Sequence, residues 1–173
     1  LGDVYKRQPL HPFEAFTASV CNLRPESRGH VHIKTQDSRE PPKIQPDYLS
    51  DPADRKVAAD AIKLTRKIVS SPAMKKFEPE EFKPGIEFAS DDDLAREAGT
   101  IGTTIFHPVG TCKMGPSSDN MAVVDERLKV HGIQGLRVVD ASVMPTITSG
   151  NTNSPTLMIA EKASEMILED APS

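Results

Sequence analysis

A histidine stands near the start of the segment FHPVGTCKMG, residues 106–115, which also contains a proline, two glycines and a cysteine. An imidazole changes charge near neutral pH, so His107 is a candidate proton acceptor or donor. Pro108 restricts His107 to an extended backbone, and Gly110 leaves space beside it for another group. Because a lone loop histidine is more often structural than catalytic, the residue type alone leaves both interpretations open.

Cys112 lies five residues after His107 and offers a different chemistry. A cysteine nucleophile activated by a histidine base is the arrangement of a cysteine hydrolase. A buried cysteine more often behaves as a small apolar residue, which favours a structural role. The two cysteines, Cys21 and Cys112, are too few for a disulfide framework and indicate a reducing compartment.

The segment SGNTNSPT, residues 149–156, places two asparagines before an apolar helical sequence. Free N–H groups and the positive end of the helix dipole would attract an anion or a polarised carbonyl there. The alternative is that Asn151 and Asn153 only form the turn and cap the helix. A third segment, GLRVVDAS, predicts a strand that ends in Asp140 and small residues, which suits close approach to the hydroxyls of a ligand.

The histidines of the segment HVHIKT, His30 and His32, share one face of a predicted strand. No third ligand stands near them, so a solvated face is favoured and no metal site is expected. The apolar run 13–23 and residues 30–34 predict an antiparallel pair around a polar turn. The proline-rich segment 40–49 should be extended and is unsuitable as a central strand.

Three helices are indicated further along the chain. The first begins near Ser50 or Asp51 with Pro52 in its first turn, and its apolar spacing predicts one buried face, formed by Val57, Ala61, Leu64 and Ile68. Ser90 and Asp93 form a capping box for the second, with Leu94, Ala98 and Ile101 as its apolar residues; it ends before Thr103, which leaves His107 in a loop.

Short strands are predicted at 122–124, 128–130 and 136–139, separated by turns. The last helix is predicted to start at Pro155, with Ser154 as its cap. Its first turns are apolar nearly all round, so its N-terminal end should be deeply buried.

The composition of the 173-residue chain, with 37% hydrophobic and 27% charged residues, is typical of a soluble globular protein with one or two small domains. The formal net charge of −4 makes nucleic acid an unsuitable partner. No apolar run approaches the ~20 residues that span a bilayer. Residues 1–11 show no clear pattern and the chain begins at Leu1, so we expect that the natural start is missing. A cytoplasmic location is expected, with membrane association through an electron acceptor left open.

The segments HPVGTCKMG, AVVDERLKVHGIQGLRVVDASVMP and SGNTNSPTLMIAEKASEMI resemble, in order and spacing, the C-terminal part of the glucose–methanol–choline family of FAD-dependent oxidoreductases. The likeness covers about residues 12–170 and is strongest to bacterial choline dehydrogenases and related alcohol dehydrogenases. The resemblance implies an α+β fold. Residues 12–120 would form the substrate-binding region, an antiparallel sheet with packed helices. Residues 121–173 would return to the FAD-binding domain with its last strand and helix.

Members of this family carry a G-x-G-x-x-G turn that holds the FAD pyrophosphate. No such turn occurs in the chain, so we expect a fragment that lacks the N-terminal FAD-binding region and is inactive alone. In the family, a hydroxyl proton leaves the alcohol and hydride passes from its carbon to flavin N5. His107 matches the histidine that serves this step, and Asn153 matches the partner position that holds the alcohol oxygen.

The resemblance also implies FAD contacts from Asp140, Ala141, Asn151, Thr152 and Thr156. The expected substrate is a small primary alcohol, whereas the particular alcohol and the electron acceptor stay open. Two alternatives to the fragment enzyme remain: a split subunit or binding module that completes an FAD-binding partner, and a hydrolase that uses Cys112 and His107.

Overall fold

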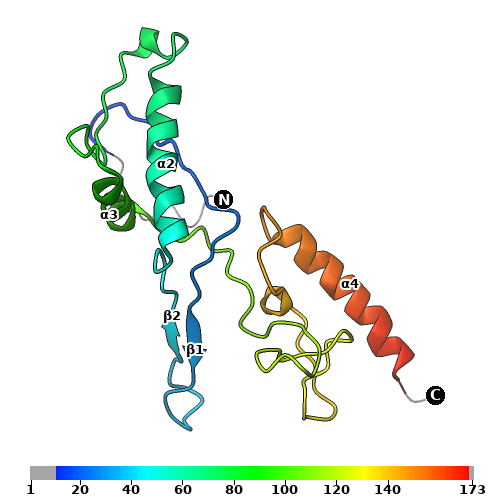
Figure 1. The fold of residues 1–173 in the computed structure, drawn as a ribbon. Helices are drawn as coiled ribbons and strands as arrows, with labels where there is room; N and C mark the ends of the chain where they lie inside the picture. Colours follow the sequence, from blue (N-terminus) through cyan, green and yellow to red (C-terminus); the bar gives the residue numbers. More distant parts are fainter. Residues whose placement is uncertain (1–10, 172–173) are drawn as a thin grey trace.

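The computed structural model describes residues 11–171, which form two parts (Figure 1). The first contains strands β1 (His30–His32) and β2 (Lys43–Gln45), helices α2 (Pro52–Val69) and α3 (Asp91–Ile101), and the short 3-10 helix η1 (Lys75–Phe77). The second contains the 3-10 helix η2 (Ala141–Val143) and helix α4 (Asn153–Glu169). Among the described residues, no hydrogen bond or ion pair joins 11–102 to 103–171. No helix in this range is long and apolar enough to cross a membrane.

The two strands pair antiparallel, with His30 opposite Gln45 and His32 opposite Lys43. The predicted pairing of 13–23 with 30–34 is therefore wrong, since residues 13–23 contain no strand. The partner comes instead from the proline-rich segment. Its prolines flank β2 on both sides and lie outside it, so the three paired residues keep their N–H groups, and a two-stranded sheet has no central strand for proline to interrupt.

Helix α2 begins as predicted, because Asp51 caps it by accepting the N–H of Ala53 at 2.7 Å. The predicted burial of its apolar face is wrong, because Val57, Leu64 and Ile68 remain 43–58% exposed. Helix α3 packs on a different face of α2, where Ala59 is fully buried. The periodicity of these apolar residues thus describes a face that the described residues leave uncovered.

The capping box of α3 is confirmed. Ser90 Oγ accepts the backbone N–H of Asp93 at 3.1 Å and donates to the Asp93 carboxylate at 2.6 Å. Leu94 is fully buried against α2, whereas Ile101 at the end of the helix stays 42% exposed. The helix ends at Ile101, as expected, so the chain reaches His107 through a loop.

The second part has its own apolar core, which consists of Val124, Leu128, Val143, Met144, Ile159 and Ala163. The three strands predicted between 122 and 139 are wrong as strands, because only the isolated bridges Val124↔Val130 and Lys129↔Arg137 join them. Left-handed residues at Leu128, Gly132 and Gly135 turn the chain too often for a ladder to extend. The segments therefore fold as consecutive tight turns that wrap the core.

Helix α4 begins at Asn153 with Thr152 as its N-cap, so the predicted start at Pro155 with Ser154 as cap is wrong. Pro155 fits inside the first turn, where the backbone N–H that proline lacks has no helical partner. The expected deep burial of the N-terminal end is also wrong for Leu157 and Met158, which are 63% and 60% exposed. Only the face with Ile159 and Ala163 contacts the core.

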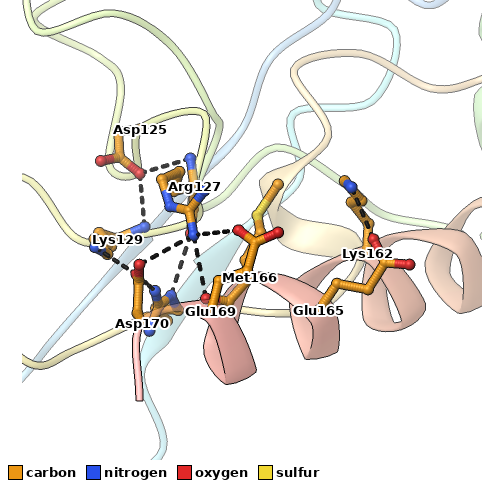
Figure 2. Close-up of polar contacts among 9 residues, drawn as sticks. Asp125, Arg127, Lys129, Lys162, Glu165, Met166, Glu169 and Asp170 are labelled. Atoms are coloured by element: carbon orange, nitrogen blue, oxygen red, sulfur yellow. Dashed lines mark hydrogen bonds and ion pairs between the residues drawn. The ribbon is translucent and has the colours of Figure 1, made fainter. Parts of the chain in front are cut away.

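The C-terminal end of α4 is tied to the turn at residues 125–129 by an ionic cluster (Figure 2). Arg127 binds the carbonyl of Met166 at 3.2 Å and the carboxylate of Glu169 at 3.0 Å. Asp125 shapes the turn by accepting the N–H groups of Arg127 and Lys129. Basic side chains at this end also interact favourably with the negative end of the helix dipole.

Candidate functional site

The loop that begins at His107 lies against the segment 142–145. The N–H of Cys112 donates to the carbonyl of Ser142 at 3.1 Å, and the N–H of Met114 donates to Val143 at 2.8 Å. Gly110 has a φ of +87°, and a Cβ there would lie 3.4 Å from the carbonyl oxygen of Met144. Glycine is therefore favoured here by its positive φ, since the neighbouring backbone alone would accept a Cβ at ordinary contact distance.

His107 joins this loop to the start of α4. Its Nδ1 lies 2.9 Å from Thr152 Oγ1, across 45 residues of sequence. The imidazole is half-buried, while Thr152 is 7% exposed. Phe106, the residue before the histidine, has a φ of +63°. A non-glycine residue in this region is uncommon and often marks a functional turn.

The N-terminus of α4 beside this histidine is open to ligands. Thr152 makes no side-chain capping bond, so its hydroxyl leaves the first-turn N–H groups of the helix free. Asn151 and Asn153 are both exposed, and no hydrogen bond within residues 11–171 uses their side chains. A Cβ on Gly150 would meet no atom within 4 Å. The donors of this helix start are thus available to a ligand.

Asp140 and Ala141 lie on the neighbouring segment. The Asp140 carboxylate caps η2 by accepting the N–H of Ser142 at 2.8 Å, and it also accepts the Ser142 hydroxyl. It is nevertheless exposed, so it retains surface for a further contact. Ala141 is half-buried and packs against the core. Thr156, one turn into α4, donates its hydroxyl to the Thr152 carbonyl at 2.7 Å.

The three motifs singled out in the sequence therefore meet at one place. The His107 loop contacts both the segment after Asp140 and the N-cap of α4. Sequence reasoning missed the bond between His107 and Thr152, because no local pattern links residues 45 positions apart. Within residues 11–171, no hydrogen bond joins Cys112 Sγ to His107, and nothing in this geometry assembles a cysteine–histidine pair.

His30 and His32 lie far from this site in the first part of the molecule, with ring centroids 4.8 Å apart. The carboxylate oxygen Oδ2 of Asp47 lies 3.8 Å from His30 Nδ1. Across the described residues there is no group of three or more histidine, cysteine or acidic side chains that could hold a metal ion.

The chemistry available at the site combines an imidazole with amide and N–H donors. An imidazole next to the positive end of a helix can take a proton while the donors stabilise developing negative charge. The donor set also fits the polar edge of a flavin, whose reduced form carries negative charge.

A family model described as GMC oxidoreductase matches residues 25–160, which include His107 and Asn153. The chain belongs to the GMC oxidoreductase family. The resemblance inferred from the three motifs is thereby confirmed, and the family consists of FAD-dependent enzymes. The matched region is the C-terminal domain of these proteins.

Two curated relatives and one solved structure illustrate the relationship. The chain is 45% identical over 153 residues to an alcohol dehydrogenase [acceptor] from Pseudomonas putida, covering 88% of this chain and 27% of that protein. It is 44% identical over 168 residues to an oxygen-dependent choline dehydrogenase from Vibrio vulnificus, covering 97% of this chain and 30% of that protein. The solved structure of an FAD-dependent oxidoreductase from Chaetomium thermophilum superimposes with a TM-score of 0.79 at 30% identity, covering 86% of this chain and 26% of that protein. The chain thus spans less than a third of the length of each of these proteins.

Proposed function

We propose that this chain forms the C-terminal, alcohol-handling part of an FAD-dependent oxidoreductase acting on CH–OH donors. His107 accepts the hydroxyl proton of the substrate, and Asn153 positions the alcohol oxygen. The observation that carries the proposal is the hydrogen bond between His107 and Thr152, because Thr152 directly precedes Asn153 and the bond therefore holds the imidazole close to Asn153. The match of residues 25–160 to the GMC oxidoreductase family supports the reaction class.

The roles of the two side chains follow from their chemistry. Asparagine has no basic nitrogen, but its amide N–H can donate to an alcohol or alkoxide oxygen. His107 therefore performs the base chemistry alone, and its Nε2 is the nitrogen left for substrate, since Nδ1 is 2.9 Å from Thr152. Removing a positioned general base lowers the rate by a factor of about 10² to 10⁴.

FAD is the proposed cofactor, and it accepts the hydride from the alcohol carbon when bound. Asp140, Ala141, Asn151, Thr152 and Thr156 are the proposed contacts. The Thr152 and Thr156 hydroxyls already bind within the chain, so these two residues would contact FAD through their backbone or methyl groups. The Asn151 amide and the free N–H groups of the first turn of α4 supply the polar contacts.

The proposed substrate is a small primary alcohol. The two curated relatives carry the names alcohol dehydrogenase and choline dehydrogenase, both of which describe oxidation of a hydroxyl-bearing carbon. Recognition of a quaternary ammonium group requires an aromatic or acidic cage. The chain contains no tryptophan, two tyrosines and six phenylalanines, so its own contribution to such a cage would rest mainly on phenylalanine and acidic side chains.

A graft tests the proposal. The C-terminal segment of the Vibrio vulnificus choline dehydrogenase, 44% identical, is replaced by this chain, and alcohol oxidation is followed with an artificial electron acceptor. We expect a flavin-containing chimera whose kcat falls by a factor of about 10² to 10⁴ in the His107→Ala variant, with flavin content unchanged. A flavin-loaded chimera that is active but insensitive to this substitution would contradict the proposal.

A second candidate is a split subunit that completes an FAD-binding partner. The exposed Leu157 and Met158 near the open end of α4 favour it, because an uncovered apolar surface beside a site is typical of an interface. The chain alone, mixed with FAD and dialysed, separates the two functions. Retained flavin with a perturbed visible spectrum favours the split-subunit function. Loss of all flavin favours the first proposal, in which the chain is the C-terminal part of a longer enzyme.

A further inference from the structure

Thr152 uses its hydroxyl in an unusual way for its position. A threonine at a helix N-cap normally accepts an N–H of the first turn through its side chain. Here that capping bond is absent, and the hydroxyl lies 2.9 Å from His107 Nδ1 instead. The N-cap backbone is also helical, with φ −85° and ψ −3°, rather than extended. The first turn of α4 thus forgoes a cap while the hydroxyl engages the imidazole.

The Thr152 side chain is held firmly in this direction. The residue is 7% exposed. Its carbonyl accepts both the backbone N–H of Thr156 at 3.1 Å and the Thr156 hydroxyl at 2.7 Å. These two bonds fix the backbone of Thr152, and a buried β-branched side chain has few rotamers, so the hydroxyl points in a narrow range of directions.

We propose that Thr152 is a positioning residue that accepts the Nδ1–H of His107 and so presents Nε2 as the atom that takes the substrate proton. This inference rests on the function proposed above. Nδ1 carries its hydrogen both before and after Nε2 is protonated, so the bond to Thr152 persists through the reaction. The hydrogen bond at one imidazole nitrogen thereby decides which form the other nitrogen takes.

A hydroxyl acceptor differs physically from the carboxylate that often orients a catalytic histidine. Among residues 11–171, no acidic side chain forms a hydrogen bond or ion pair with His107. Thr152 therefore fixes the ring orientation without adding a negative charge beside a flavin that becomes negative on reduction.

The test uses nuclear magnetic resonance of the 173-residue chain with ¹⁵N-labelled histidine, without FAD or substrate. The His107 signals are assigned by their loss in the His107→Gln variant. At a pH where the ring is neutral, we expect a protonated Nδ1 and an unprotonated Nε2. Thr152→Val should shift both signals toward an exchanging mixture of the two forms. Thr152→Ser, which keeps the hydroxyl, should restore the original signals.

Thr65→Val is the matched control, because Thr65 donates its hydroxyl to the Ala61 carbonyl at 2.9 Å in α2 and should leave the His107 signals unchanged. A wild-type chain with a protonated Nε2 and a bare Nδ1 overturns the proposal, even if Thr152→Val does not fold. Unaltered signals in a folded Thr152→Val chain overturn it as well. Failure of the proposed function appears separately, as an active His107→Ala chimera.

Discussion

Asp170 Oδ2 lies 2.6 Å from Lys129 Nζ, so the residue after α4 is bound to the turn at residues 125–129. Arg127 approaches the other carboxylate oxygen at 3.1 Å, and Arg137 also pairs with Asp170. The hydrogen bond from Lys129 is the main reason that the pKa of Asp170 falls from 3.8 to about 2. One carboxylate thus balances three cations at the end of the helix (Figure 2).

This ionic cluster predicts a specific loss of stability in acid. The pKa of Asp170 is lower in the folded chain than in the unfolded one, so its contribution is complete above pH 3.8 and disappears as the pH falls toward about 2. The free energy of unfolding, measured with urea at several pH values, should therefore fall less steeply in this window for Asp170→Asn than for the wild type. Identical pH slopes for the two chains would contradict the assignment.

Asp54 predicts a stability effect in the first part of the molecule. Burial tends to raise its pKa, but bonds from Ser27, the Glu26 N–H and Asn22 outweigh it and lower that pKa. In Asp54→Asn, one carboxylate oxygen becomes an NH₂ group that faces the N–H donors of this site and cannot accept from them. We therefore expect the free energy of unfolding to drop by about 2 kcal/mol. The matched control is Asp92→Asn on the exposed first turn of α3, where we expect roughly 0.5 kcal/mol or less. Equal losses in both variants would refute this role.

Arg66 fastens the loop 81–88 to α2. Its guanidinium forms a two-bond pair with Glu81, at 2.8 Å each, and also binds the carbonyls of Gly85 and Phe88. Lysine lacks the planar fork for these four bonds. In Arg66→Lys, amide hydrogen exchange should accelerate in residues 81–88, while Arg24→Lys, at an exposed side chain, should leave it unchanged. Unaltered exchange in this loop would show that other contacts hold it.

Cys112 separates the oxidoreductase from the hydrolase alternative. Its backbone N–H binds Ser142, and its thiol is free and half-buried. We expect Cys112→Ala to leave alcohol oxidation by the chimera within about twofold of the unsubstituted chimera. The isolated chain should release no product from an activated ester. Ester hydrolysis that is lost on alkylation of Cys112 would instead favour the hydrolase.

The starts of α2 and α3 could be predicted from the sequence because their capping is local. Asp51 with Ala53, and Ser90 with Asp93, lie two or three residues apart, so each bond is encoded in a short stretch. The partner of β1 could not be predicted in this way, since pairing depends on which extended segment the fold brings alongside. The predicted burial of the apolar face of α2 was wrong for a related reason. The spacing of Leu64 and Ile68 indicates an apolar face, but it does not identify the residues that would cover that face.

The candidate site divides along the same line. The motifs around His107 and Asn153 were visible as residue types in turn-rich segments, and the family match includes both. The contact between the Thr152 hydroxyl and the imidazole could not be predicted, because the local sequence around Thr152 indicates only a turn. Its role depends on the approach of two loops, which Gly110 permits through its φ of +87°.

The uncovered apolar residues of α2 and α4 have a consequence for the chain in solution. Leu64 and Ile68 lie in one part of the molecule, and Leu157, Met158 and Leu168 lie in the other. A molecule with two different adhesive surfaces joins its neighbours head to tail, and such contacts extend into open chains unless the rotation closes a ring. The isolated polypeptide should therefore form a series of oligomers rather than one dimer. Its weight-average mass should then rise continuously with protein concentration.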